Sequence, residues 1–161
     1  MAQRAVLAGG CFWGVEELFR KLPGVQDTRV GYTGGHTEFP KYEDVKTGST
    51  GHAEAIEVVF DESSISFKEI LLFFFKMHDP TTRNRQGNDV GSQYRSTIFF
   101  TGESQKTDAQ DVIKEVDASG KWPKPVVTTL EEFKEFYLAE EYHQEYLKKN
   151  PGGYTCHFIR E

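Results

Sequence analysis

Apolar residues recur along this chain in short continuous or alternating runs that predict β-strands. Runs of roughly four to eight such residues, bounded by glycine, proline or other turn formers, are typical of buried strands. The segments with this pattern are 3–8, 25–32, 53–60, 94–100 and 126–129.

Between these runs the apolar spacing changes to that of an α-helix. Segments 12–21, 66–77 and 103–118 place apolar side chains three or four positions apart. Ser66 and Glu69 form a capping box at the start of the second segment, which supports a helix boundary there. We expect three helices from these segments, and one more helical turn around residues 42–46 inside a long polar loop.

The C-terminal third predicts two more helical segments. Thr129 and Glu132 have the spacing of a capping box, so we expect a helix that continues through Tyr137. A second helical stretch is expected over residues 142–147, and it ends at the Asn-Pro-Gly-Gly sequence of residues 150–153.

Strands and helices therefore alternate, with enough helices to cover one side of a sheet. This order predicts an α/β (α+β) fold: a two-layer sandwich of a mixed sheet with helices, with a ferredoxin-like core, long loops and an irregular C-terminal tail. With 161 residues, we expect a single catalytic domain over 1–161, with a tail at about 150–161.

Charge and hydropathy narrow the class of protein. The net charge of -6 and the absence of basic clusters argue against nucleic-acid binding. The longest apolar run, residues 70–75, is too short to span a membrane, and the N-terminus lacks the apolar region of a secretion signal. We expect a cytoplasmic monomer whose two cysteines are reduced unless they cycle catalytically.

The candidate chemistry centres on Cys11, which stands between the first predicted strand and the first predicted helix. Glycines at 9, 10 and 14 allow a sharp turn and a close approach of ligand to backbone. The free N–H groups of a helix start would stabilise a thiolate there, and the thiolate is the nucleophilic form. The alternative is that Cys11 is a small buried apolar residue, but Phe12 and Trp13 beside it cannot both point into a core.

Glu54 is a candidate acid. In a strand over residues 53–60, period-two alternation places Glu54 on the same face as Ile56, Val58 and Phe60, which is the core face. Burial would raise the pKa of the carboxyl, so that it could hold a proton near neutral pH. The strand pattern equally permits a strand that begins one residue later, with Glu54 in solvent.

The second cysteine, Cys156, lies in a glycine-flanked tail. The chain contains no Cys-x-x-Cys or His-x-x-x-His pair, so zinc spacing and a thioredoxin-like redox motif are both absent, and we expect no metal or cofactor. Two distant cysteines suit an attacking thiol and a resolving thiol. The alternative is that Cys156 is packed in a short strand-like run over residues 156–159.

Three motifs resemble those of the A-type peptide methionine sulfoxide reductases. Residues 10–14, Gly-Cys-Phe-Trp-Gly, are similar to the nucleophile motif of that family, and residues 51–54, Gly-His-Ala-Glu, to its acid motif. Residues 87–96, Gly-Asn-Asp-Val-Gly-Ser-Gln-Tyr-Arg-Ser, are similar to its substrate-pocket segment. The resemblance runs in order from about residue 4 to residue 158.

The resemblance implies thiol-dependent reduction of the S epimer of methionine sulfoxide, free or in oxidised proteins, with thioredoxin as reductant. Cys11 would attack the sulfoxide sulfur, and a Cys11 sulfenic acid would then be resolved as a disulfide with Cys156. The implied substrate-binding residues are Phe12 and Trp13 around the methyl group, Tyr42 and Tyr94 with Glu54 at the oxygen, and Asp89 at the backbone amide.

One departure from the family concerns the second thiol. Family members commonly have cysteine directly after Gly-Tyr, whereas here Thr155 intervenes. Two other functions share part of the pattern: a two-cysteine thiol peroxidase, which would need neither Trp13 nor a protonated Glu54, and a non-catalytic module that binds oxidised methionine, which would need neither acid nor resolving thiol.

Overall fold

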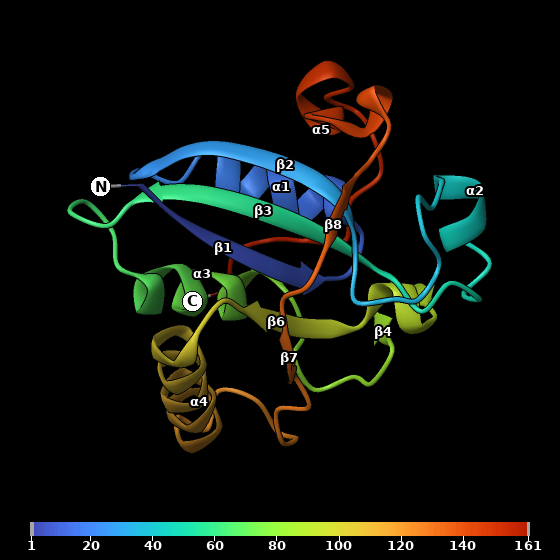
Figure 1. Cartoon of the computed structure of the whole chain (residues 1–161). Coiled ribbons are helices and arrows are strands. Elements are labelled where there is room, and N and C mark those ends of the chain that lie inside the picture. The colour runs from blue at the N-terminus through green and yellow to red at the C-terminus, as the bar shows by residue number, and fades with distance from the viewer. Residues whose placement is uncertain (1, 161) are drawn as a thin grey trace.

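The computed structural model describes residues 2–160, which form a curled sheet with helices packed against it (Figure 1). The strands are β1 (Ala2–Gly9), β2 (Val25–Thr33), β3 (Ala53–Asp61), β4 (Arg85–Gln86), β5 (Asp89–Val90), β6 (Ser96–Phe100), β7 (Thr129–Glu132) and β8 (Phe136–Leu138). The helices are α1 (Phe12–Arg20), α2 (Tyr42–Val45), α3 (Phe67–Met77), α4 (Glu103–Ala118) and α5 (Tyr146–Lys149), with 3₁₀ turns η1 (Ser92–Tyr94) and η2 (Glu141–His143).

The strand order confirms the predicted ferredoxin-like core. The main sheet has the order β7-β6-β1-β3-β2-β8, and its four central strands are antiparallel. With α1 between β1 and β2 and α3 between β3 and β6, these elements follow the β-α-β-β-α-β order of that fold. The edge strand β7 runs parallel to β6, so the sheet is mixed, as predicted.

The main core lies between this sheet and the three long helices. Every second residue of β3, namely Ile56, Val58 and Phe60, packs into one apolar cluster with α1, α3 and α4. The capping box of α3 forms as predicted: Glu69 N–H donates to Ser66 Oγ, and Ser66 N–H donates to Glu69 Oε1, each at 3.1 Å. These contacts fix α1, and Cys11 at its start, against the sheet.

The predicted helix from Thr129 through Tyr137 is wrong. Residues 129–132 form β7, which pairs with β6, and residues 136–138 form β8, which pairs with β2. Phe133 and Phe136 cover a small apolar cluster on the sheet face opposite the helices. Pairing with two exposed strand edges and burial of both rings outweigh a local capping pattern. The strand predicted at 126–129 is therefore displaced to 129–132.

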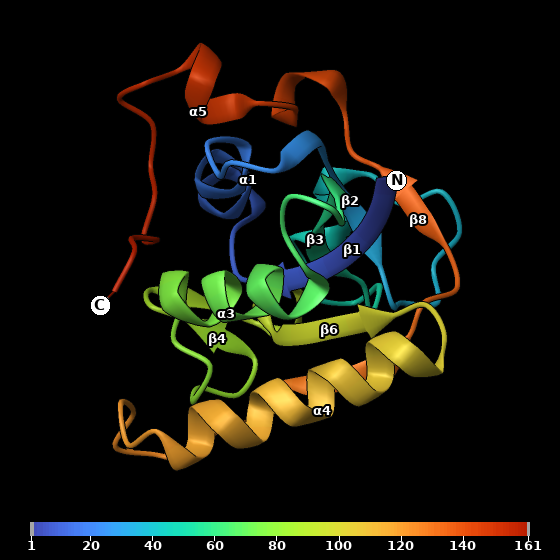
Figure 2. The same ribbon diagram turned by 90° about the vertical axis from the view of Figure 1, so that its left-hand side faces the viewer.

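Two other boundaries differ from the prediction. The strand expected from Tyr94 begins at Ser96, because Tyr94 closes the 3₁₀ turn η1. The helical stretch expected over 142–147 is split into η2 and α5, because Glu145 adopts a left-handed conformation with φ of 51°. Figure 2 shows α5 beside α1, with the tail running from α5 past α1 toward α3. Among residues 2–160, no helix combines the length and apolar character needed to cross a membrane.

Candidate active site

Cys11 is the N-cap residue of α1, directly after β1, as the sequence predicts. Gly10 has φ of +100°, which favours glycine, and a Cβ there would meet Gln86 at 2.7 Å. The Cys11 side chain is buried, with 8% exposure. It therefore sits at a tight strand-to-helix turn, with the segment around Gln86 packed directly over the turn.

The expected stabilisation of a Cys11 thiolate is outweighed in this structure. Burial raises the pKa of the Cys11 thiol, and the negative charge of Glu54 raises it further, whereas a hydrogen bond from the Trp13 backbone N–H lowers it. The helix start does act in the predicted direction, but desolvation is the larger effect. The raised pKa therefore keeps the Cys11 thiol protonated at neutral pH.

Glu54 faces the helix side of β3, which confirms the core-facing alternative. Its side chain is buried at 2% exposure, and its Oε1 accepts a hydrogen bond of 3.1 Å from the Phe12 N–H. Burial raises the pKa of Glu54 to about 8, although the bond from Phe12 opposes this shift. The carboxyl group is therefore mostly protonated at neutral pH and lies beside the residue that follows Cys11.

Two tyrosines from separate loops converge on this pair. Tyr42 begins α2 and Tyr94 ends η1, and both are half-buried. Burial raises the pKa of Tyr42 to about 12 and also raises that of Tyr94, and the charges of Glu54 and Cys11 contribute to both shifts. Both hydroxyls therefore keep their protons at neutral pH and can donate hydrogen bonds.

The two aromatic residues after Cys11 have different surroundings. Phe12 is buried at 1% exposure and packs against Tyr32, with ring centroids 5.7 Å apart. Trp13 is half-buried: its Nε1–H donates to His143 Nδ1 at 2.9 Å, and its ring stacks on Tyr146 at 3.8 Å. His143 is buried, and its Nε2 has no hydrogen-bond partner among the described residues.

Sequence reasoning missed His143 and Tyr146. They are three positions apart in an aromatic-rich segment, which is a weak signal, and the contact between Trp13 and His143 joins residues 130 positions apart. Only the tertiary fold brings that segment against α1.

Asp89 and Cys156 lie together beside the turn at Gln86. The Cys156 thiol is half-buried and lies 3.9 Å from Asp89 Oδ2, and the Tyr154 hydroxyl donates to the same oxygen at 3.3 Å. Burial and the Asp89 charge raise the pKa of Cys156. Both cysteines are free thiols. They lie close enough to each other for a negative charge on Cys156 to raise the pKa of Cys11.

The tail that carries Cys156 is docked along α1. His157 is buried, and its Nε2 lies 2.7 Å from the Gly9 carbonyl oxygen. A methyl group at Gly14 would overlap His157 and Thr155, so the glycine permits this approach. Residues 156–159 form no strand, and Cys156 is held by these tail contacts instead of by strand pairing. His157 is a further residue that the sequence pattern did not identify.

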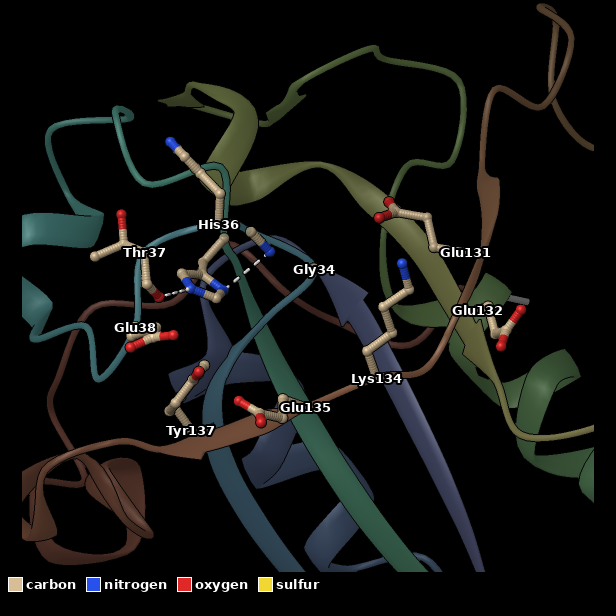
Figure 3. Close-up of a pocket in the computed structure, with 11 residues that line it drawn as sticks. Gly34, His36, Thr37, Glu38, Glu131, Glu132, Lys134, Glu135 and Tyr137 are labelled. Atoms are coloured by element: carbon tan, nitrogen blue, oxygen red, sulfur yellow. Dashed lines mark hydrogen bonds between the residues drawn. The ribbon is translucent and has the colours of Figure 1, made fainter.

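A cavity of about 650 Å³ is a different feature from this site. It lies around His52, whose ring bonds to Gly35 and Thr37, and side chains of the segment joining β7 to β8 project beside it (Figure 3). Its lining includes carboxylates and no thiol, so it does not supply the chemistry of Cys11. Within residues 2–160, no cluster of three or more His, Cys, Asp or Glu side chains is arranged to hold a metal ion.

Comparisons with known proteins agree on one family. The family model described as peptide methionine sulfoxide reductase matches residues 3–161. A peptide methionine sulfoxide reductase MsrA from Mycolicibacterium vanbaalenii is 56% identical over 98% of this chain and 91% of its own length.

Solved structures give the same result. Mxr1 from Saccharomyces cerevisiae in reduced form is 40% identical, with a TM-score of 0.94 over 99% of this chain and 93% of that one. The same yeast protein in complex with Trx2 matches over 99% of this chain and 91% of that one, with 26% identity and a TM-score of 0.68.

Proposed function

This chain belongs to the A-type peptide methionine sulfoxide reductases, and we propose that it reduces the S epimer of methionine sulfoxide, free or within proteins, back to methionine. The observation that carries the proposal is the Cys11–Glu54 arrangement: a buried thiol at the start of α1, next to a buried carboxyl whose pKa of about 8 keeps it mostly protonated. A sulfoxide oxygen leaves sulfur readily only after protonation, so the reaction requires such an acid beside a sulfur nucleophile.

In the first step, Cys11 Sγ attacks the sulfoxide sulfur as Glu54 gives its proton to the sulfoxide oxygen. The resulting hydroxyl group then passes from the substrate sulfur to Cys11 Sγ, and the bond between the two sulfurs breaks as methionine leaves. The thiol proton replaces the one that Glu54 has lost. The net reaction converts the Cys11 thiol and the sulfoxide into a Cys11 sulfenic acid and methionine, so that sulfur in the substrate is reduced and Cys11 is oxidised. Protonation of Glu54 also removes the negative charge that raises the pKa of Cys11, so the two groups titrate as a pair.

The substrate is held from two sides. The neutral hydroxyls of Tyr42 and Tyr94 donate to the sulfoxide oxygen, a role that their raised pKa values support. Phe12 and Trp13 form apolar walls for the methyl group, and the contacts from His143 and Tyr146 hold the Trp13 ring in place. An Asp89 carboxylate oxygen accepts a hydrogen bond from the backbone N–H of the substrate.

In the second step, Cys156 resolves the sulfenic acid. The Cys156 thiol attacks Cys11 Sγ, the two sulfurs form a disulfide, and the sulfenic oxygen leaves as water with the thiol proton. The proximity of the tail to α1 supports this role. A thioredoxin-type dithiol then reduces the disulfide, a step supported by the yeast relative bound to Trx2.

Epimer-resolved turnover tests this proposal. The protein, thioredoxin, its reductase and NADPH are incubated with each purified epimer of methionine sulfoxide, and methionine is quantified by chromatography. We expect methionine from the S epimer and none above background from the R epimer. Equal use of both epimers, or of neither, would contradict the proposed specificity. Turnover of hydrogen peroxide but of neither epimer would favour the thiol peroxidase.

A further inference from the structure

One segment of the chain contacts both sides of the proposed substrate pocket. We name residues 139–149, between β8 and the C-terminal tail, the strap; Figure 1 shows this segment rising from β8 toward α5. The strap is attached to the edge of β2, where the Ala139 N–H donates to the Val30 carbonyl at 3.0 Å and the Gln144 amide bonds to both backbone groups of Val30. The strap carries His143 and Tyr146 to Trp13.

Glu140 is the residue of the strap that reaches the opposite side of the pocket. Its Oε2 accepts a hydrogen bond of 2.9 Å from the Tyr42 N–H, and its Oε1 accepts one of 2.8 Å from the Tyr32 hydroxyl. Burial acts against ionisation, but the hydrogen bonds from Tyr42 and Tyr32 outweigh it and lower the pKa of Glu140. The carboxylate is therefore ionised at neutral pH, with both oxygens occupied.

The bond to Tyr42 has a physical reason in the helix that it begins. The first N–H groups of an α-helix have no partner within the helix, and a negative charge near them is stabilising. Tyr42 is the first residue of α2, so its N–H is one of these groups, and Glu140 supplies the acceptor from 98 positions away. Glu140 thus caps α2 from outside its own loop.

Tyr42 needs this attachment because the helix that carries it is very short. The helix α2 has four residues and lies in the loop between β2 and β3, and helices of that length are not stable alone. Besides Glu140, the strap also contributes His143, whose ring lies 4.6 Å from that of Tyr42. The position of the Tyr42 hydroxyl near Glu54 therefore follows from how the strap holds the start of α2.

We propose that Glu140 is a positioning residue that fixes Tyr42 for its hydrogen bond to the sulfoxide oxygen. This inference rests on the proposed function, because it assigns Glu140 an effect on substrate that passes through the Tyr42 hydroxyl. The second bond, to Tyr32, whose ring packs on Phe12, connects the same carboxylate to the apolar wall. Glu140 itself touches no substrate.

A double-mutant cycle tests the inference. The variants are Glu140→Gln, Tyr42→Phe and their combination, with Glu141→Gln as a matched control because the neighbouring Glu141 side chain is 89% exposed. The two bonds end on different oxygens of Glu140, and glutamine has an acceptor oxygen at only one of these positions, so Glu140→Gln cannot keep both bonds in their present geometry. We measure kcat/KM with the S epimer, its pH dependence, and the melting temperature of each variant.

We expect Glu140→Gln to lower kcat/KM on the order of ten- to a hundred-fold, as misplacement of a substrate-binding group does. In the Tyr42→Phe background the same change should cost less than about three-fold, because the hydroxyl to be positioned is absent. In every variant of the cycle, the rate should still fall as pH rises through about 8, because that fall reflects loss of the Glu54 proton. Glu141→Gln should match wild type.

Equal losses from Glu140→Gln in both backgrounds would overturn the inference and leave Glu140 as a structural anchor of the strap. A kcat/KM of Glu140→Gln equal to that of the wild type would also overturn the inference. If Glu140→Gln does not fold, Glu140→Asp, which keeps the charge but shortens the reach, enters the same cycle with the same expected outcomes. A wild-type protein that reduces neither epimer would instead refute the proposed function itself.

Discussion

Replacing Glu54 by glutamine should make the protein slower and more stable at the same time. Burial raises the pKa of Glu54 from 4.5 to about 8, and each pKa unit corresponds to about 1.4 kcal/mol. The full shift is therefore on the order of 5 kcal/mol, a large part of the free energy of unfolding of a typical domain. Glutamine has the same shape and no charge, so it avoids this cost.

The sign of the effect follows from proton binding. The folded state holds the Glu54 proton more tightly than the unfolded state, so its contribution to stability is fully present below about pH 4.5 and is lost as pH rises through about 8. Glu54→Gln should therefore exceed wild type in free energy of unfolding by little at about pH 5 and by several kcal/mol at about pH 8.5. Urea titrations of both proteins at the two pH values measure the difference.

The catalytic effect has the opposite direction. Loss of the acid should slow single-turnover formation of methionine by roughly a hundred- to ten-thousand-fold. The wild-type rate should also fall as pH rises through about 8, where Glu54 loses its proton, and the variant should lose this dependence. A stability difference that stays constant between the two pH values would refute the buried, protonated state of Glu54, and an unchanged rate would refute its role as the acid.

Three other variants separate the remaining parts of the site. Cys156→Ser should release about one equivalent of methionine in a burst and then stall with thioredoxin, while dithiothreitol restores turnover, because the first step needs only Cys11; full thioredoxin-driven turnover would contradict the resolving role. Trp13→Phe loses the hydrogen bond that holds the ring at His143, so the ring is no longer fixed against the substrate methyl group and kcat/KM should fall roughly five- to a hundred-fold, while the unpaired His143 costs about 1 to 3 kcal/mol and lowers the melting temperature by only several degrees; normal kcat/KM with a lowered melting temperature would make Trp13 a packing residue. Gly14→Ala should displace the tail at His157, so the methionine burst should persist while thioredoxin-driven turnover, measured by NADPH consumption, falls; unchanged turnover would show that docking of the tail is not required.

The sequence pattern predicted the parts of the fold that depend on local apolar spacing. The central strands and α1, α3 and α4 were predicted close to their observed bounds because each buries an apolar run in the main core. The period of β3 left two alternatives equally open for Glu54, and its burial in the structure confirms the core-facing one. The segment 129–138 was assigned the wrong structure because its conformation depends on pairing with β6 and β2, which no local pattern encodes.

The site was predictable only in part for the same reason. Cys11 and Glu54 stand in distinctive local settings, a glycine-bounded turn and a polar position on a core face. His143 and His157 are single histidines in polar segments, and they acquire partners only when the strap and the tail pack along α1. The pKa of Cys11 was expected to be lowered by the helix start, but the depth of burial that raises it is a property of the complete fold.

Mass spectrometry of the reduced protein after addition of the S epimer, with no reductant present, tests the central claim most directly. The account predicts about one equivalent of methionine, the loss of two hydrogens from the intact protein, and a peptide pair in which Cys11 is joined to Cys156. Cys11→Ser should give neither methionine nor a change in mass. Methionine formation by Cys11→Ser, or an unchanged mass in wild type, would contradict the account.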